Sequence, residues 1–533
     1  MKRIALVSLL AAAAFSATAQ TIGDALQMSE NEYMGTARTM AMGNAFTALG
    51  GDIGSFGINP AGSAVARYAQ FALTPNLSIA STGTAFNADP LHNAYDPAAN
   101  RNRSRFTLPN YGVSLYMNLG KRSGLKGVSF GFVGNATANY LERAVVSGTN
   151  PYSSFMAEMA DGLAYDGVPF TTFSNNPNEN YNNSMLSWRE ALGWNTGMFY
   201  HPDGADPADY LASTEVAPYD LGGPLIQHWG RSTRGYKHDM VLNFGMNFSD
   251  VFFLGANLGL VSIEMNRTST LIEEAKNPAD FPNRFDDILT NFRSARLQDY
   301  LTVDGSGVYG KFGFIYVPNP AFRIGAAVQT PTLTHIHEFF RTSGALDFTD
   351  SYYSAEDTTP QGEGEYRILS PYRVNAGVAV NFGMGVISAD YEMTDYSTMQ
   401  FRSAYADLSS YDYAAENQDI RNVFGMSHAF RFGFEVKPLP ELAIRAGYSL
   451  VTLAEKDHDP DNGYRQAASV GLGYSSGGSF FCDFALRASF RAAEYYQLYN
   501  NYLYVDDILQ TASPKVRITN NLIDAALTFG WRF

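Results

Sequence analysis

The chain has 533 residues, a formal net charge of −15 and a mean hydropathy of −0.17. The acidic balance argues against a nucleic-acid partner, and a single cysteine, Cys482, excludes an internal disulfide framework. Aromatic side chains make up 14% of the residues, with 33 Tyr and 37 Phe. So many aromatic residues are typical of membrane strands with aromatic girdles, and alternation along such strands hides their hydrophobicity from the average.

The first segment is predicted to be a secretory signal peptide. Lys2 and Arg3 form a short basic head, residues 4–15 are apolar, and residues 17–19 offer an A-x-A cleavage site. We therefore expect residues 1–19 to be removed, and no cysteine follows that would carry a lipid anchor. After removal, no apolar run approaches the ~20 residues that a transmembrane helix needs.

Residues 20–67 precede the first predicted strand and contain short motifs of small residues. Residues 37–48 read ARTMAMGNAFTA, a moderately helical stretch, and residues 50–53 form a Gly-Gly-Asp-Ile turn. Asn59-Pro60-Ala61 follows, where the proline biases Asn59 toward an extended backbone and the amide is free to bond nearby backbone groups. This segment is expected to be a plug with an apolar surface formed by Met42, Phe46, Leu49, Phe56 and Ile58.

Residues 68–533 are predicted to form an up-and-down antiparallel β-barrel. In the alternating segments one face is apolar and the other carries small, polar or charged side chains, as lipid and lumen require. About fourteen strands are expected: 68–80, 105–119, 126–140, 236–249, 251–266, 300–317, 321–335, 366–382, 384–397, 423–437, 441–454, 464–476, 479–492 and 518–533.

Short and long connections alternate between these strands. The short turns (249–250, 318–320, 383 and 476–478) are assigned to the periplasm. The long stretches (81–104, 141–235, 267–299, 338–365, 398–422, 455–463 and 493–517) are assigned to the cell exterior. In the longest of them, 141–235, five side chains recur at helical spacing and are expected to form an apolar capture groove. They are Tyr152, Phe155, Met156, Met159 and Leu163. The alternative is a helix that packs on its own loop.

The last strand carries the clearest pattern. Ile523, Leu527, Phe529, Trp531 and Phe533 share one face, and small or polar residues occupy the other. A soluble protein would rarely end on so apolar an unprotected edge, whereas a strand that closes a membrane barrel has no free edge.

The chain resembles the long-chain fatty-acid outer-membrane transporter family of the FadL/TodX type, as a Bacteroidetes-like member. The resemblance is carried by residues 35–62, with their "G-AR--A-G-A" order, Gly/Asp turn and Asn-Pro-Ala motif, and by the aromatic C-terminus. It implies a helical hatch in the lumen, gated around Asn59, Pro60 and Ala61. It also implies an inward kink in the third strand that opens the wall sideways. Gly131, Gly134 and Asn135 are the residues expected at that kink.

Inward charges on later strands are predicted to form a cross-strand ionic ladder, in which one or two arginines alternatively hold a ligand carboxylate. The residues are Arg373, Arg431, Arg445, Arg487, Arg491, Glu392, Glu435, Asp483 and Asp524. The expected function is passive uptake of a hydrophobic molecule, a fatty acid or an aromatic hydrocarbon, with lateral release into the bilayer.

The expected location is the bacterial outer membrane, with both termini periplasmic. The expected partners are the ligand, outer-membrane lipids and lipopolysaccharide, and the barrel-assembly machinery, which reads the C-terminal strand. No catalytic residue, cofactor or metal site is predicted. Two alternatives remain open: a haem receptor using His335 and His337, and a structural or adhesive surface barrel.

Overall fold

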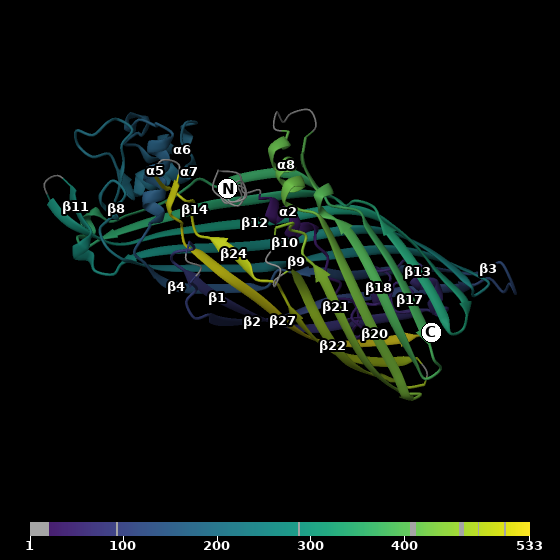
Figure 1. The fold of residues 1–533 in the computed structure, drawn as a ribbon. Coiled ribbons are helices and arrows are strands. Elements are labelled where there is room, and N and C mark those ends of the chain that lie inside the picture. Colours follow the sequence, from purple (N-terminus) through teal and green to yellow (C-terminus); the bar gives the residue numbers. More distant parts are fainter. Residues whose placement is uncertain are drawn as a thin grey trace.

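The computed structural model describes residues 21–91, 94–285, 288–405, 412–457, 463–477, 479–505 and 508–533 and is built mainly of strands (Figure 1). The predicted signal peptide, residues 1–19, lies outside these ranges. Fourteen antiparallel strands form a closed barrel, because β1 pairs with β2 on one side and with the last strand, β27, on the other. The wall strands are β1 (Gln70–Asn87), β2 (Ala99–Asn118), β3 (Leu125–Asn139), β9 (Leu225–Phe248), β10 (Phe252–Ala275), β12 (Ile288–Asn319), β13 (Phe322–Gln329), β17 (Arg373–Asn381), β18 (Gly385–Asp395), β20 (Met426–Leu439), β21 (Leu442–Thr452), β22 (Tyr464–Ser475), β23 (Phe480–Phe490) and β27 (Lys515–Arg532).

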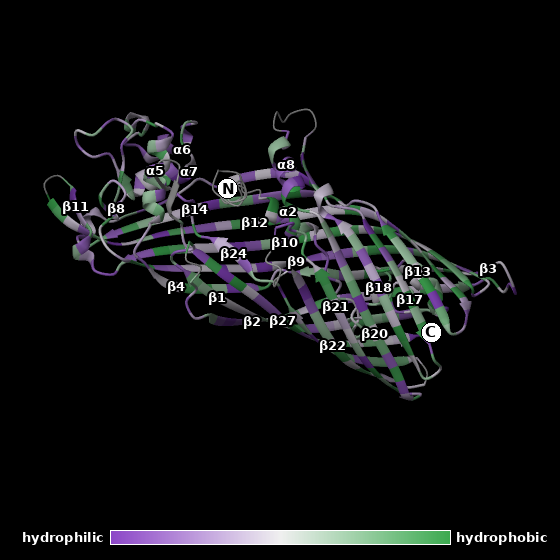
Figure 2. Cartoon of the chain, viewed as in Figure 1, coloured by the Kyte–Doolittle hydropathy of each residue, from purple (hydrophilic) through white to green (hydrophobic). Residues whose placement is uncertain are grey.

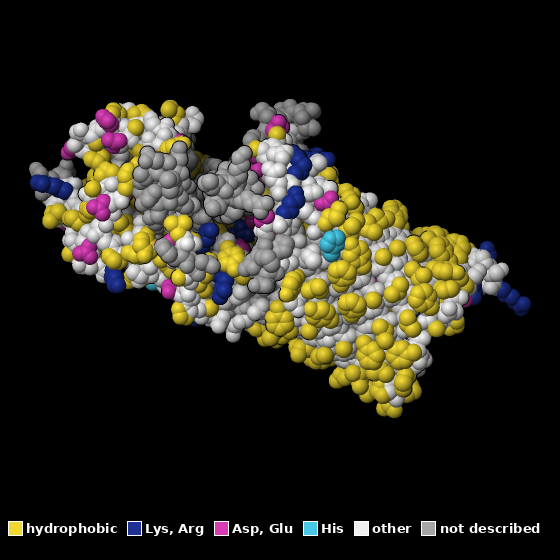
Figure 3. Space-filling model, in the orientation of Figure 1, with side chains coloured by type: hydrophobic (Ala, Val, Ile, Leu, Met, Phe, Trp, Pro, Cys, Tyr) yellow, Lys and Arg dark blue, Asp and Glu magenta, His cyan; other side chains and the backbone are white. Residues whose placement is uncertain are grey.

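The predicted alternation holds in the half of the barrel that carries the C-terminus. On β20, Phe430, Phe432 and Phe434 are exposed, whereas Arg431 and Glu435 on the opposite face are buried in the interior. Figure 2 shows the resulting stripes on β20, β21 and β22, and Figure 3 shows apolar side chains gathered over this half of the wall. A closed barrel with an apolar outer surface is the form in which strands satisfy their backbone groups in lipid.

Farther along the strands, the apolar face changes sides. On β10, Leu258 and Leu260 are exposed on the outer face, whereas Val261, Ile263 and Met265 are buried on the inner face. The outer half of the wall therefore has an apolar interior and a polar exterior, as in a water-exposed sheet.

This change of face explains why the strands run farther than predicted. Most of 267–299 is strand, because β10 continues to Ala275 and β12 begins at Ile288. Much of 338–365 is likewise paired, so both loop predictions are corrected. Two predicted single strands are each split in two around a proline, Pro331 and Pro371, because proline cannot donate to a ladder. Additional wall segments are β4 (Glu142–Asn150), β11 (Pro282–Phe285), β14 (Leu333–Phe348), β15 (Ala355–Thr358), β16 (Gly362–Leu369), β19 (Gln400–Ser403) and β24 (Glu494–Gln497).

The segment before β1 fills the barrel. Its elements are α2 (Ile22–Ser29), α3 (Ala37–Ala41), η1 (Ile53–Ser55) and α4 (Gly62–Ala66), which touch β3, β9, β10, β21, β22, β23 and β27 among others. We call residues 21–67 the hatch. The described helices of this chain are all too short or too polar to cross a membrane.

A second group of short elements caps the end of the barrel that lies away from the C-terminus (Figure 1). The cap, residues 151–224, contains α5 (Phe155–Tyr165), η2 (Phe170–Thr172), α6 (Pro177–Asn182), α7 (Trp188–Thr196), β5 (Phe199–Tyr200), β6 (Leu211–Ala212), β7 (Glu215–Ala217) and β8 (Asp220–Leu221). The remaining elements are η3 (Pro278–Asp280), η4 (Ser351–Tyr353), η5 (Tyr396–Thr398), α8 (Ala414–Val423), β25 (Leu503–Val505) and β26 (Ile508–Thr511).

Candidate functional site: the hatch, the lumenal pocket and the seam in the wall

Side chains of the barrel wall hold three carbonyl groups of the hatch between residues 56 and 60. Asn257 Nδ2 donates to Phe56 O at 2.8 Å, and Lys311 Nζ donates to Gly57 O at 2.8 Å. Asn243 Nδ2 donates to Pro60 O at 3.0 Å. Carbonyl groups left inside a barrel need such donors, because an unpaired buried acceptor destabilises the fold. The hatch is therefore fixed through its backbone around the Asn-Pro-Ala motif.

Asn59 contributes both halves of its amide to this attachment. Its Nδ2 donates to Thr47 O at 2.6 Å within the hatch and to Phe314 O at 3.0 Å on β12. Its Oδ1 accepts from Ala61 N at 3.1 Å. The predicted bonding of Asn59 to nearby backbone is confirmed, and the donation to Phe314 adds a link between hatch and wall that the sequence did not reveal.

The apolar residues expected to face a ligand are instead enclosed. Met42, Phe46 and Leu49 pack in one buried cluster with Ala48 and Ile58, and Phe56 is fully buried beside β3. None of the five expected residues lines the lumenal pocket described below. In this state they join the hatch to the wall, and a role in ligand contact stays a prediction.

The predicted ionic ladder is present. Arg373 and Arg431 share Glu392, Arg445 bridges Glu435 and Asp483, and Arg487 pairs with Asp524, with N···O distances from 2.6 to 3.4 Å. Arg491 instead pairs with Glu32 of the hatch at 3.1 Å.

Three further charged links tie the hatch to the barrel. Arg38 pairs with Glu435, Arg465 with Glu30 and Arg267 with Asp24. No local pattern predicted these pairs, because the hatch residue and its partner lie hundreds of positions apart.

A pocket lies between the hatch and the inner face of β17, β18 and β20–β23, with about 760 Å³ of empty space that is partly open to solvent. Five arginines line it against two glutamates, Glu32 and Glu392; the arginines are Arg373, Arg431, Arg465, Arg487 and Arg491. An excess of guanidinium groups suits a carboxylate better than a neutral ligand. Apolar lining is limited to side chains such as Val451 and Phe490.

The hydrogen-bonded pairing of neighbouring wall strands is interrupted between β2 and β3. β2 and β3 pair from Asn118↔Gly127 up to Asn110↔Asn135, where the pairing ends. β2 continues along β1 as far as Ala99, whereas β3 continues along β9 and shifts register between Ala136 and Ala138. Leu141 then packs on Ala80 and Leu522, which face the lumen, so the chain has turned inward. We call the discontinuity between β2 and β3–β4 the seam.

The residues predicted to kink the third strand lie just below the seam. A side chain at Gly131 would point at the ring of Phe56 in the hatch, 3.1 Å from Cβ. A side chain at Gly134 would collide with Tyr111 and His238, whose rings stack on each other 5.5 Å apart. Asn135 is the last residue of β3 that pairs with β2. The irregularity itself follows at 136–138, just past the predicted 131–135.

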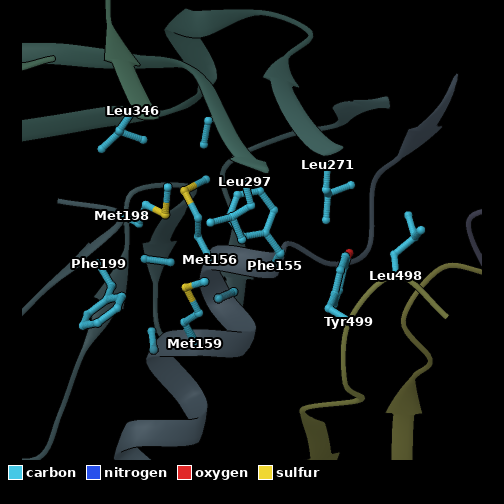
Figure 4. Packing of buried hydrophobic residues seen from close by; sticks show 14 of the residues in the cluster. Phe155, Met156, Met159, Met198, Phe199, Leu271, Leu297, Leu346, Leu498 and Tyr499 are labelled. Carbon is cyan, nitrogen blue, oxygen red and sulfur yellow. The ribbon is translucent and has the colours of Figure 1, made fainter. Parts of the chain in front are cut away.

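The groove predicted in the long outer segment is not present. Phe155, Met156, Met159 and Leu163 are all buried in a cluster that the cap shares with the barrel wall, and Figure 4 shows the first three packed among Met198 and Phe199 of the cap and Leu297 of β12. Only Tyr152 of the predicted set is exposed. The helix packs on its own segment, as in the alternative interpretation, and also on wall strands such as β10 and β12. Helical periodicity in a loop cannot distinguish a core from a binding face, because both need the same stripe.

The two histidines of the haem alternative lie on β14. His335 Nε2 is 3.9 Å from Glu365, and the ring of His337 packs against Phe339. Among the residues that the structure describes, no three metal-binding side chains form a cluster.

Comparison with solved structures identifies the fold. A Pseudomonas aeruginosa FadL homologue matches over 94% of this chain and 98% of its own, at 14% identity and a TM-score of 0.50. The P. putida toluene transporter TodX matches over 95% and 99% at 14% identity (TM-score 0.48), and the CymD monoaromatic hydrocarbon channel over 94% and 97% at 12% (TM-score 0.46). No protein-family model and no curated protein matches the chain. The chain thus has the fold of FadL-type barrels, as its sequence predicted.

Proposed function

We propose that this protein is an outer-membrane channel for the passive uptake of hydrophobic small molecules, with long-chain fatty acids as the favoured class. The observation that carries the proposal is the seam, which interrupts the wall of a closed, plugged barrel beside the hatch motif. A ligand that reaches the lumen is blocked below by the hatch and can leave sideways. Release into lipid is downhill for an apolar molecule, so no energy source is required.

The lumenal pocket supports a fatty acid over an aromatic hydrocarbon. Arg373 and Arg431 share one carboxylate, Glu392, and a guanidinium binds a carboxylate through two parallel hydrogen bonds. A neutral hydrocarbon would remove water from these charges without replacing it. The FadL and TodX names of the similar structures fit either class of hydrophobic ligand.

In the proposed path, the ligand enters the pocket from outside and the hatch shifts around Asn59, Pro60 and Ala61. The ligand then passes Gly131 and Phe56 to reach the seam. Outer-membrane lipid receives the ligand, and lipopolysaccharide surrounds the outer half of the barrel. Both termini are periplasmic, and the C-terminal strand with Trp531 is recognised by the barrel-assembly machinery.

Uptake of radiolabelled oleate by cells that express the protein tests this proposal. In Gly131→Leu, a side chain would enter the space between β3 and Phe56, so uptake should fall to the level of cells without the protein. Gly310→Leu is the matched control, because a Cβ there finds only ordinary contacts, at 3.7 Å and beyond. Equal uptake by both variants and the parent barrel would overturn the lateral path. Absence of uptake by the parent would overturn the fatty-acid assignment.

A further inference from the structure

Two arginine side chains replace the missing backbone pairing across the seam. Arg103 on β2 donates from NH1 to Glu142 O at 3.2 Å and to Ser232 Oγ at 2.8 Å. Arg105 donates from NH1 to Gly235 O at 2.8 Å, with its guanidinium 5.6 Å from the centre of the Tyr236 ring. The acceptors belong to β4 and β9 on the far side of the seam. Side-chain bonds to neutral oxygens can be exchanged for another acceptor without unfolding a strand ladder.

Buried amide groups without partners lie directly below these arginines. Asn110 and Asn135, the last pair of the β2–β3 ladder, are bonded to each other through Asn110 Nδ2 and Asn135 Oδ1 at 2.6 Å. Asn110 Oδ1 and Asn135 Nδ2 have no partner among the described residues, although the side chains are 0% and 4% exposed. Asn76 Oδ1 and Asn139 Oδ1, on the two sides of the seam, are in the same situation.

Of these four atoms only Asn135 Nδ2 is a hydrogen-bond donor, so it is the one that an incoming carboxylate would satisfy. Asn135 Nδ2 is directed toward the hatch, because a Cβ at Gly57 would lie 3.1 Å from it. Among the described residues, this unpartnered N–H group therefore lies between the hatch and the end of the β2–β3 ladder.

The outer surface beside the seam is apolar. Phe106, which follows Arg105 in the chain, is 73% exposed, and Leu108 and the cross-strand neighbour Leu77 are also exposed. Polar and apolar groups thus meet along one edge of β2, with guanidinium and amide groups facing the seam and an aromatic ring facing outward.

We infer that the seam binds the head group of an anionic amphiphile while its chain passes into lipid, with Arg103 and Arg105 as the residues that select for charge. The inference rests on the proposed function and narrows it. A carboxylate that arrives at the seam takes the place of Glu142 O and Gly235 O, because charge-assisted bidentate bonds are stronger than bonds to neutral carbonyls. The seam then parts, Asn135 Nδ2 donates to the head group, and the acyl chain lies along Phe106 and Leu108.

The test compares two radiolabelled probes of the same chain length, oleate and oleyl alcohol, in cells that express each variant. In Arg103→Gln/Arg105→Gln, oleate uptake is expected to fall about tenfold or more while oleyl alcohol uptake changes less than twofold. Arg105→Lys keeps the charge but loses the fork, so an intermediate oleate rate is expected. Arg101→Gln is the matched control, because Arg101 is exposed on the same strand and its NH1 reaches only Asn100 O beside it, at 3.4 Å.

Heat-modifiable migration of each variant on gels establishes that the barrel is folded, and Arg105→Lys provides the readout if the double variant does not fold. Equal loss of both probes, or undiminished oleate uptake, would overturn the inference and leave the proposed channel intact. Uptake of oleyl alcohol but not oleate by the parent protein would overturn it as well. If the parent transports neither probe, the proposed function fails and the inference fails with it.

Discussion

Replacing Asn59 by aspartate isolates the donor half of the amide that fastens the hatch. Aspartate keeps an oxygen to accept the Ala61 N–H, but it places a second oxygen where Nδ2 donates to Thr47 O and Phe314 O. Each buried carbonyl left without its donor costs about 1–3 kcal/mol, so docking of the hatch should weaken by about 2–6 kcal/mol. Since about 1.4 kcal/mol is a tenfold change, the undocked fraction should rise roughly 30-fold to 10⁴-fold.

Conductance of the purified protein in planar lipid bilayers at pH 7.5 measures this change, because a displaced hatch leaves an ion-permeable lumen. Asn59→Asp should open far more often per inserted molecule than the parent protein. Asn381→Asp is the matched control, because the exposed Asn381 only accepts, from Gly383 N at 3.1 Å, and an aspartate oxygen does the same. If Asn59→Asp conducts no more than this control while remaining heat-modifiable, the amide is not what holds the hatch.

Three further substitutions probe the rest of the molecule. Arg445→Met leaves Glu435 and Asp483 with one cation fewer in the interior, so the free energy of unfolding of the barrel should fall by about 3–5 kcal/mol. On gels, the fast-migrating folded form should then disappear at a lower temperature. Arg402→Met, at an exposed position, is the control and should not have this effect. Leu163→Ala opens a cavity in the cap and lowers its stability by about 2–5 kcal/mol. Protease cleavage within residues 151–224 should therefore increase while the melting temperature of the barrel stays the same. A lowered barrel melting temperature would show that cap and barrel unfold together. Burial raises the pKa of Glu215 in the cap from 4.5 to about 7, so its contribution to stability is complete below pH 4.5 and is lost as the pH rises through 7. Proteolysis of the cap should therefore increase from pH 5 to pH 8 in the parent and stay flatter in Glu215→Gln, and equal slopes would contradict this assignment.

The part of the fold that obeys a local rule could be predicted from the sequence. Alternation of Phe430, Phe432 and Phe434 with Arg431 fixes which face of β20 meets lipid, since period two is a property of any strand. The bonding of Asn59 to nearby backbone follows in the same way from the proline beside it.

What could not be predicted depends on contacts between distant segments. The seam exists because Asn110 and Asn135 end one ladder while β2 and β3 continue along different neighbours, and no local pattern marks that point. The glycines at 131 and 134 indicated the region but not the residues at which the register shifts. Nothing in the sequence marked Arg103 and Arg105 as residues of the seam, because arginines at alternate positions occur on any strand with a polar face.

The change of the apolar face between Leu260 and Val261 has a mechanical consequence. A strand cannot slide along its axis to adjust to a thinner or thicker bilayer, because either direction would bring a mismatched face into lipid or into water. Sinking by a few residues would place the polar outer face near Ser262 and Glu264 in hydrocarbon, and rising would expose Leu258 to water. The depth of immersion is thus encoded in each such strand, and membranes of unmatched thickness should deform around the protein while the barrel keeps its position.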